Sequence, residues 1–265
     1  MEFSHFGALI AFICYISATL AVVLRLFHPK GPHIITILTL GCLAIIAHTL
    51  NTVDYLFKQE VVNFSLPNVV SLVSLIITLT VTALALRFKV NLLIPVTYSF
   101  AGLWQLMMIF TPQGHGTPAI SEDLTVLSHI TLALIAYCVL VIATLFSFQV
   151  AYINMKLKRK NLAAVHHLPP LMQVETQLFV ILFIGTTCLF LSQLTGFIFL
   201  ENFISKENAH KTVLSIIALV FYFIILWGHY NQGWRGHRVL TLTVIATSLL
   251  TLAYFGSRFV KEFLL

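Results

Sequence analysis

Two histidines inside long apolar stretches are the residues of this chain best suited to chemistry. His48 and His129 each stand in a run that is apolar enough for a membrane helix. An ionisable side chain is costly there and is therefore a functional candidate. At a rise of about 1.5 Å per residue, both imidazoles are expected roughly 8–9 Å below the outer ends of their helices. Two helices running in opposite directions would thus bring two imidazoles to the same depth.

Small residues on the same helical face as each histidine leave room for a flat ligand. Gly41 and Ala44 lie seven and four residues before His48, and Ala133 and Ala136 lie four and seven residues after His129. Axial ligation of one haem iron by both histidines, between facing helices, suits this arrangement. Two other interpretations stay open. Each imidazole can hydrogen-bond a carbonyl of a neighbouring helix, or it can take part in proton or metal transfer.

A third histidine, His229, ends an apolar stretch within the run Trp227–Arg238. Aromatic and arginine side chains stand there among glycines, which is typical of a helix end at the level of the lipid headgroups. The other histidines fall in connections or near helix ends, so the sequence indicates no shared site for them.

Sequence motifs of catalysis and of small metal sites are missing. Cys14, Cys42, Cys138 and Cys188 lie inside apolar stretches, and none forms the CxxC pair of redox or zinc sites. There is no Ser/His/Asp order, no HExxH and no phosphate-binding glycine loop. We therefore expect that the protein is not an enzyme.

The composition places these histidines in a polytopic membrane protein. Of the 265 residues, 59% are apolar and 9% are charged, against about 45–50% and about 25% in an average soluble domain. Roughly 20 apolar residues cross a bilayer as a helix. Eight such runs predict an all-α transmembrane bundle that forms a single domain over residues 1–265. The runs are Phe6–Leu26, Ile34–Asp54, Pro67–Leu86, Leu92–Phe110, Leu124–Tyr152, Leu178–Leu200, Val213–His229 and Val239–Phe259.

The basic residues predict how the chain is oriented. Ten of the 15 Lys and Arg residues fall in the connections after the first, third, fifth and seventh spans, with one acid, Glu175. The positive-inside rule then places the cluster Lys156–Lys160 in the cytoplasm and both termini outside. The net charge of +6 favours contact with anionic membrane lipids. Its division among four short loops argues against nucleic-acid binding.

Several segments resemble the YpjD-type inner-membrane proteins, which belong to the broader CcsA/CcmC cytochrome c assembly group and have HemX-type proteins as close relatives. The similarity covers essentially the whole chain, with eight spans in the expected order. It is carried by Leu66–Leu75, Ser128–Tyr137, Pro169–Met172, Lys211–Ser215, Trp227–Arg238 and Leu252–Arg258.

The resemblance implies a haem-handling protein of the bacterial inner membrane that is linked to cytochrome c biogenesis. His129 matches the place of an external haem ligand in the wider group, and His229 matches a haem ligand within the membrane. His48 belongs to the YpjD-type pattern. The leading hypothesis is a haem b held by His48 and His129 as iron ligands, with His229 at a second, inner position or beside a haem propionate near Arg235.

One departure from the group changes the expected role. Active haem presenters carry a tryptophan-rich WWD loop before the seventh span, whereas Glu201–Lys211 contains no Trp. This favours binding, relay or regulation of haem over its presentation to an apocytochrome. An alternative is a regulatory or scaffolding subunit of another inner-membrane protein complex, for ion transport or haem synthesis, which docks through Lys156–Glu175 and holds no cofactor. A small-solute permease ranks third, because the sequence has no clear inverted repeat.

Overall fold

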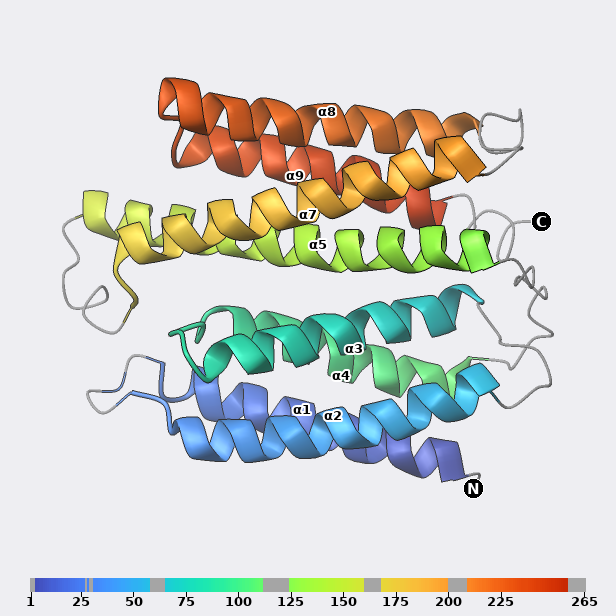
Figure 1. Ribbon diagram of the computed structural model, residues 1–265. Coiled ribbons are helices and arrows are strands. Elements are labelled where there is room, and N and C mark those ends of the chain that lie inside the picture. Colours follow the sequence, from blue (N-terminus) through green and yellow to red (C-terminus); the bar gives the residue numbers. More distant parts are fainter. Residues whose placement is uncertain are drawn as a thin grey trace. The chain divides into compact units, whose positions relative to one another are not determined.

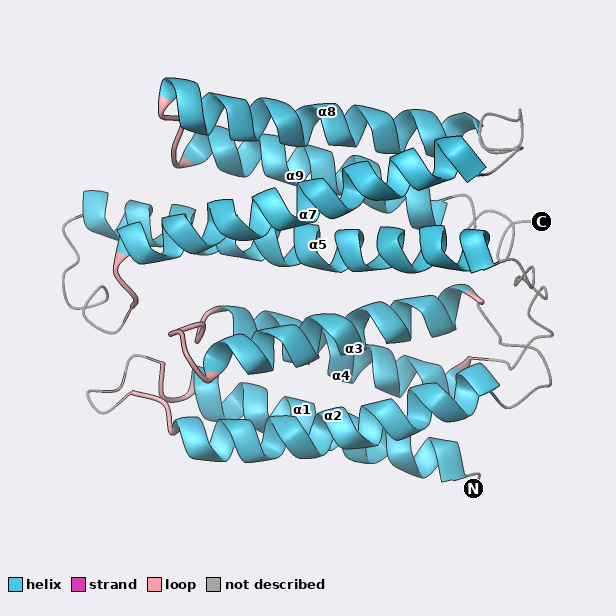
Figure 2. Cartoon of the chain, viewed as in Figure 1, coloured by secondary structure: helices cyan, strands magenta, loops and turns pink. Residues whose placement is uncertain are grey.

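Every element of the described chain is helical. The computed structural model describes residues 3–26, 28, 31–57, 65–111, 124–159, 168–199 and 209–256, and this part contains no strand (Figure 1 and Figure 2). Within it, eight helices are long and apolar enough to cross a membrane, which confirms the predicted all-α polytopic bundle. The elements are α1 (Phe3–Val23), α2 (Ile34–Phe57), α3 (Leu66–Ala85), α4 (Leu93–Phe110), α5 (Leu124–Lys158), α7 (Leu171–Phe199), α8 (Ala209–Gln232), α9 (His237–Thr251) and the π-helix η1 (Leu252–Gly256).

The helices group into two compact units. The first is built from α1 to α4, and the second from α5, α7, α8, α9 and η1. His48 belongs to the first unit, whereas His129 and His229 belong to the second. The single domain predicted over residues 1–265 stays a prediction.

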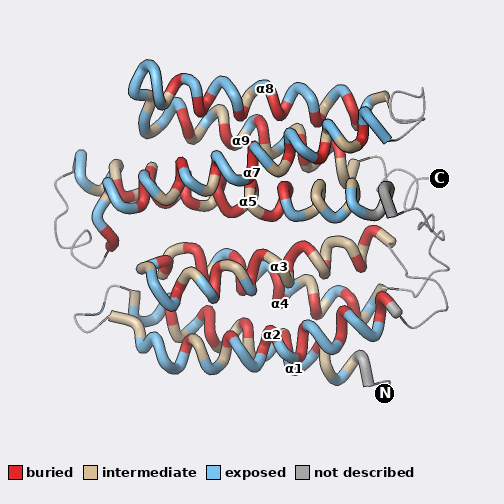
Figure 3. The backbone as a smooth tube through the Cα atoms, viewed as in Figure 1, coloured by how far each residue is buried: buried red, intermediate tan, exposed pale blue. Residues whose placement is uncertain are grey.

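In the first unit, α1 packs against both α2 and α4. Its buried face carries small residues at helical spacing, Ala8, Ala11 and Ala18, with Tyr15 between them. Small side chains let helices approach closely, and such close packing is a main source of helix association inside a bilayer. Buried and exposed positions alternate along these helices (Figure 3). The exposed positions include large apolar side chains such as Ile46, as expected for helices that face lipid.

In the second unit, α5 and α7 form the principal seam. Gly185 of α7 lies so near α5 that a Cβ there would meet Leu140 Cδ2 at 2.8 Å. Hydroxyl groups tie the other helices to this seam: Thr144 of α5 lies 2.6 Å from Thr247 of α9, which lies 2.8 Å from the Tyr222 phenol of α8. The second unit is therefore held by close backbone approach and by interhelical hydrogen bonds.

Two helices extend further than the apolar pattern predicted. α7 begins at Leu171, directly after Pro170, rather than at Leu178. Polar residues in its first two turns, including Glu175, hid this part of the helix from a count of apolar residues. α5 has 35 residues and is therefore about 52 Å long, against roughly 30 Å for the hydrocarbon core of a bilayer. The α5 extension contributes Asn154 and Lys158, and the α7 extension contributes Glu175, to the polar contacts near the turn between α8 and α9.

Candidate functional site

His48 lies at the centre of the first unit with both ring nitrogens hydrogen-bonded. It stands in α2, nine residues before the end of the helix, and its exposed fraction is 0%. The Tyr15 phenol lies 3.2 Å from Nδ1, and the Ser71 hydroxyl lies 3.2 Å from Nε2. Because these partners come from α1 and α3, the imidazole joins three helices.

The bonds of His48 belong to a larger buried network. Ser71 Oγ also lies 2.9 Å from the Thr52 hydroxyl and accepts a hydrogen bond of 2.9 Å from Gln105 Nε2. Gln105 Oε1 accepts in turn from Asn51 Nδ2 at 2.6 Å. This network joins α2, α3 and α4 through side-chain hydrogen bonds, although the buried Asn51 Oδ1 has no partner among the described residues. His48 therefore bonds neighbouring helices, as one interpretation of the sequence expected, but through hydroxyl groups rather than a carbonyl.

The space that small residues leave near His48 is already filled. Tyr98 of α4 is fully buried and its phenol lies 2.6 Å from the Thr82 hydroxyl of α3. That phenol occupies the slot over Gly41, where an added Cβ would overlap Tyr98 Oη. The ring of Tyr15 packs against that of Tyr98 with centroids 5.1 Å apart. Within the first unit the space beside His48 is therefore occupied by protein side chains, and iron ligation would require one of its two hydrogen bonds to break.

His129 presents a different pattern in the second unit. It lies five residues after the start of α5 and is partly exposed. Its Nδ1 lies 2.8 Å from the backbone oxygen of Ser192 in α7. A carbonyl can only accept, so Nδ1 carries the proton and the lone pair of the ring is on Nε2. This bond is the contact with a carbonyl of a neighbouring helix that one interpretation of the sequence expected. The same arrangement also orients the ring of histidines that bind a metal.

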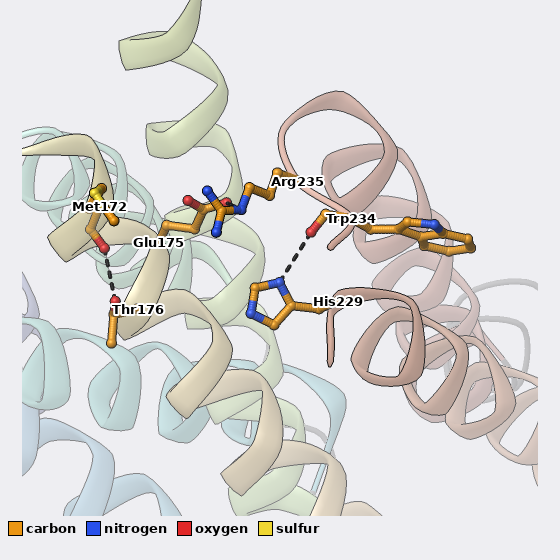
Figure 4. Close-up of polar contacts among 6 residues, drawn as sticks. All are labelled: Met172, Glu175, Thr176, His229, Trp234 and Arg235. Carbon is orange, nitrogen blue, oxygen red and sulfur yellow. Dashed lines mark hydrogen bonds and ion pairs between the residues drawn. The ribbon is translucent and has the colours of Figure 1, made fainter. Parts of the chain in front are cut away.

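A turn at the end of α8 places a backbone carbonyl beside Nδ1 of His229 as well. Gly233 has φ +64° and its N–H bonds the His229 carbonyl at 3.1 Å, the left-handed cap that glycine favours. The N–H of Trp234 then bonds the Gly228 carbonyl at 3.0 Å, and a Cβ at Gly228 would overlap the Trp234 ring. This turn brings the Trp234 carbonyl to 3.1 Å from His229 Nδ1 (Figure 4). The lone pair of His229 is therefore also on Nε2.

An aromatic ring and an ion pair, both involving α7, lie near His229. Its ring stacks on Phe179 of α7, with centroids 3.3 Å apart and planes 13° apart. Glu175, one turn earlier on α7, pairs with Arg235, with Oε1 3.6 Å from Nε (Figure 4). Glu175 is 12% exposed and Arg235 is 63% exposed, so the guanidinium faces outward while the carboxylate anchors it.

His129 and His229 lie at two separate levels of the second unit. Their contacts on α7 are Ser192 and Phe179, which are thirteen residues and therefore about 20 Å apart along the helix. One iron cannot accept both imidazoles across this distance. The prediction that His48 and His129 share an iron joins two units and stays a prediction.

Buried polar atoms without a partner occur in both units. Within the described residues they include Thr19 Oγ1 and Asn51 Oδ1 in the first unit, and both amide atoms of Gln149, the Oε1 of Gln193 and the phenol of Tyr254 in the second. Each such atom in a folded protein calls for an explanation, such as an ordered water or a bound group. Gln193 directly follows Ser192, the partner of His129.

Two further expectations concern metal-binding clusters and the connections on either side of α7. Over the described ranges there is no group of three or more His, Cys, Asp or Glu residues that could hold a metal ion, so an ion bound by protein ligands alone is not indicated there. Most of the segment Glu201–Lys211 and the basic residue Lys160 lie outside the described residues. The roles of Ser192 and Phe179 gave no signal in the sequence, whereas the glycines at 228 and 233 were visible as a helix-ending pattern.

The fold defines a polytopic helical membrane protein. In its second unit, backbone carbonyls orient the imidazoles of His129 and His229. Residues 36–265 match the model of the family described as "Cytochrome C assembly protein", and the chain belongs to this family. This confirms the resemblance found in the sequence and supports a role in cytochrome c biogenesis.

Two relatives illustrate that membership. "Inner membrane protein YpjD" of Escherichia coli (strain K12) is 44% identical over 200 residues, which cover 76% of this chain and 76% of YpjD. The "Uncharacterized 28.8 kDa protein in nifR3-like 5'region" of Azospirillum brasilense is 32% identical over 153 residues, covering 57% of this chain and 55% of that protein. No solved structure matches the chain.

Proposed function

We propose that the protein binds haem b in its second unit, through His129 and His229, and that it relays or regulates haem during cytochrome c biogenesis in the bacterial inner membrane. The observation that carries this proposal is the common state of the two imidazoles. Each donates its Nδ1–H to a backbone carbonyl, at 2.8 and 3.1 Å, and so has its lone pair on Nε2. At His48 both partners are hydroxyl groups, which can donate or accept and so do not fix which nitrogen carries the proton.

Each part of the second unit has a role in this proposal. When bound, haem would supply an iron whose properties depend on the polarity and hydrogen bonding around it. His129 and His229 would hold it through their ring nitrogens, and the carbonyls of Ser192 and Trp234 fix their ring orientation. Arg235, held by Glu175, is placed to meet a propionate.

The separation of His129 and His229 along α7 favours storage or relay of haem within the membrane over its presentation to an apocytochrome. About 20 Å of α7 separates the contacts of His129 from those of His229, so the histidines serve separate positions, one in each half of the bilayer. The sequence between α7 and α8 contains no Trp, and without aromatic side chains a haem edge has little to stack on. We therefore infer storage, relay or control of haem within the membrane, with both termini of the chain outside the cytoplasm.

The direct test is the absorption spectrum of detergent-purified protein from haem-replete cells. Wild-type protein should show a Soret band, and the haem-to-protein ratio should fall by about half in His129→Ala and in His229→Ala. The double variant should be colourless. His237→Ala is the matched control, since this histidine of the same unit hydrogen-bonds the Thr241 side chain instead of a carbonyl. A colourless wild-type protein, or a double variant with full Soret absorbance, would overturn the proposal.

A further inference from the structure

A polar cavity of about 460 Å³ lies at the end of the second unit where α8 turns into α9. Asn154 and Lys158 from the end of α5 form one wall, and the turn between α8 and α9 forms the other. Two aromatic side chains of α8, Trp227 and Tyr230, are 56% and 66% exposed close to this turn. Exposed Trp and Tyr mark the headgroup level of a bilayer, so the cavity lies at that level.

The walls of this cavity carry positive charge. Lys158, Arg235 and Arg238 line it together with His237, and among the described residues no carboxylate does. Glu175 pairs with Arg235 from outside the cavity and leaves most of the guanidinium exposed. Like charges around one space repel each other, and an anion between them relieves that repulsion. The cavity is therefore suited to an anionic group.

The backbone adds donors to the same space. Gly236, with φ +64°, turns the chain into α9, and a Cβ there would meet Asn154 Nδ2 at 3.2 Å. No side chain caps this helix within the described structure. The first N–H groups of α9 are therefore at the end of the helix that borders the cavity. Backbone donors and the helix dipole favour phosphate at such an end.

An apolar groove of about 410 Å³ runs along the same two helices, α5 and α9. Phe148 of α5 and Leu252 at the start of η1, directly after α9, line it and are 50% and 58% exposed. His237, which lines the cavity, and Val244, which lines the groove, are seven residues apart and so share one face of α9. The helix from His237 to Leu252 is about 22 Å long, more than half the roughly 30 Å hydrocarbon core.

We propose that this cavity and groove form a specific site for one anionic phospholipid of the inner leaflet. The phosphate headgroup lies among the cations at the turn, and an acyl chain lies in the groove between α5 and α9. Arg235 borders both this cavity and the proposed haem position at His229, so the groove is what distinguishes the lipid site. The residues that line the groove include no His, Cys or Met, so an iron porphyrin would have no axial ligand there. A free phosphate would use the cavity but leave the groove without a role.

Native mass spectrometry of the full-length protein in non-ionic detergent tests this site. After exchange into mixed micelles with equal phosphatidylglycerol and phosphatidylethanolamine, about one phosphatidylglycerol should be retained per chain in preference to the zwitterionic lipid. Removing two cations in the Lys158→Gln/Arg238→Gln variant should lower that retention roughly thirtyfold, because each cation near a membrane surface contributes about fivefold. The matched control is Arg87→Gln/Lys89→Gln, which removes the same charge from exposed positions of the first unit and should retain the lipid.

A second variant separates a lipid from a free phosphate. Ser248→Phe fills the groove at an exposed position without changing any charge, so it should reduce phosphatidylglycerol retention while binding of inorganic phosphate, measured by titration calorimetry, stays as in wild type. It also serves as the test if the double variant does not fold. Equal retention of both lipids by wild-type protein overturns the proposal. So does unchanged retention in Ser248→Phe, which would indicate a phosphate site only.

Discussion

Replacing His48 separates a role in packing from a role as an iron ligand. His48→Ala removes the imidazole, whereas His48→Gln replaces it with an amide that can still donate and accept a hydrogen bond. If His48 holds α1, α2 and α3 together through Tyr15 and Ser71, the alanine variant is destabilised and the glutamine variant is largely restored. If His48 ligates haem, both variants lose the cofactor alike.

The size of the effect follows from the contacts of His48. Two side-chain hydrogen bonds are lost, and such bonds inside membranes average about 0.6 kcal/mol each. Their partners are not orphaned, because Tyr15 lies 3.1 Å from the Thr78 hydroxyl and Ser71 has two further bonds. The fully buried alanine site also leaves a cavity, and large-to-small changes of this kind cost about 2–5 kcal/mol in all. We expect about 2–4 kcal/mol for His48→Ala and about 0–1 kcal/mol for His48→Gln.

Thermal unfolding and the absorption spectrum should be measured on the same detergent preparations. At about 2–4 °C per kcal/mol for a chain near this size, His48→Ala should melt roughly 5–15 °C below wild type, and His48→Gln within a few degrees of it. Both should keep the Soret band of any haem that wild-type protein carries. A His48→Ala variant that melts like wild type would refute the packing role, and a His48→Gln variant that has lost the Soret band would support a shared iron with His129.

Three further predictions concern glycines and orientation. Gly185→Ala should lower the unfolding free energy by about 0–2 kcal/mol, since overpacking of the α5–α7 seam outweighs the gain in helix propensity. Gly7→Ala, whose Cβ would meet nothing nearer than 3.8 Å, should be neutral or stabilising in the same melting assay. Gly228→Ala should displace Trp234 and with it the bond that orients His229, which should lower the haem-to-protein ratio; an unchanged spectrum would contradict this. A C-terminal fusion should be active as alkaline phosphatase and dark as green fluorescent protein, and the opposite result would exclude termini on the outer side.

The architecture could be predicted because each span repeats one physical requirement. A helix must satisfy its own backbone bonds and present about 20 apolar residues to lipid, and the apolar runs that result are visible in a single sequence. The beginning of α7 was missed because it does not present an apolar surface. Its first seven residues, Leu171–Gln177, are only partly apolar, and Glu175 among them pairs with Arg235. A helix that leaves the hydrocarbon core loses the apolar pattern by which it would be recognised.

The candidate site could be predicted only as a set of histidines. His48 and His129 look alike in the sequence, since each is a lone imidazole among apolar residues with small neighbours at helical spacing. Their environments differ through partners that are 33 and 63 residues away, Tyr15 and Ser192. Apolar periodicity carries no information about such pairs. The sequence did identify Trp227–Arg238 as a helix end, and the glycines there are what place a carbonyl beside His229.

The chemistry of those partners, rather than the histidines themselves, decides what each imidazole can do. A hydroxyl can donate or accept, so Tyr15 and Ser71 can engage both nitrogens of His48 whichever one carries the proton. A backbone carbonyl can only accept, so Ser192 and Trp234 each select a single tautomer. A ring fixed in this way keeps its lone pair on Nε2 in every conformation that retains the bond. The carbonyls of the second unit therefore fix the tautomer of His129 and His229, while the hydroxyl groups of the first unit leave the tautomer of His48 open and join three helices through it.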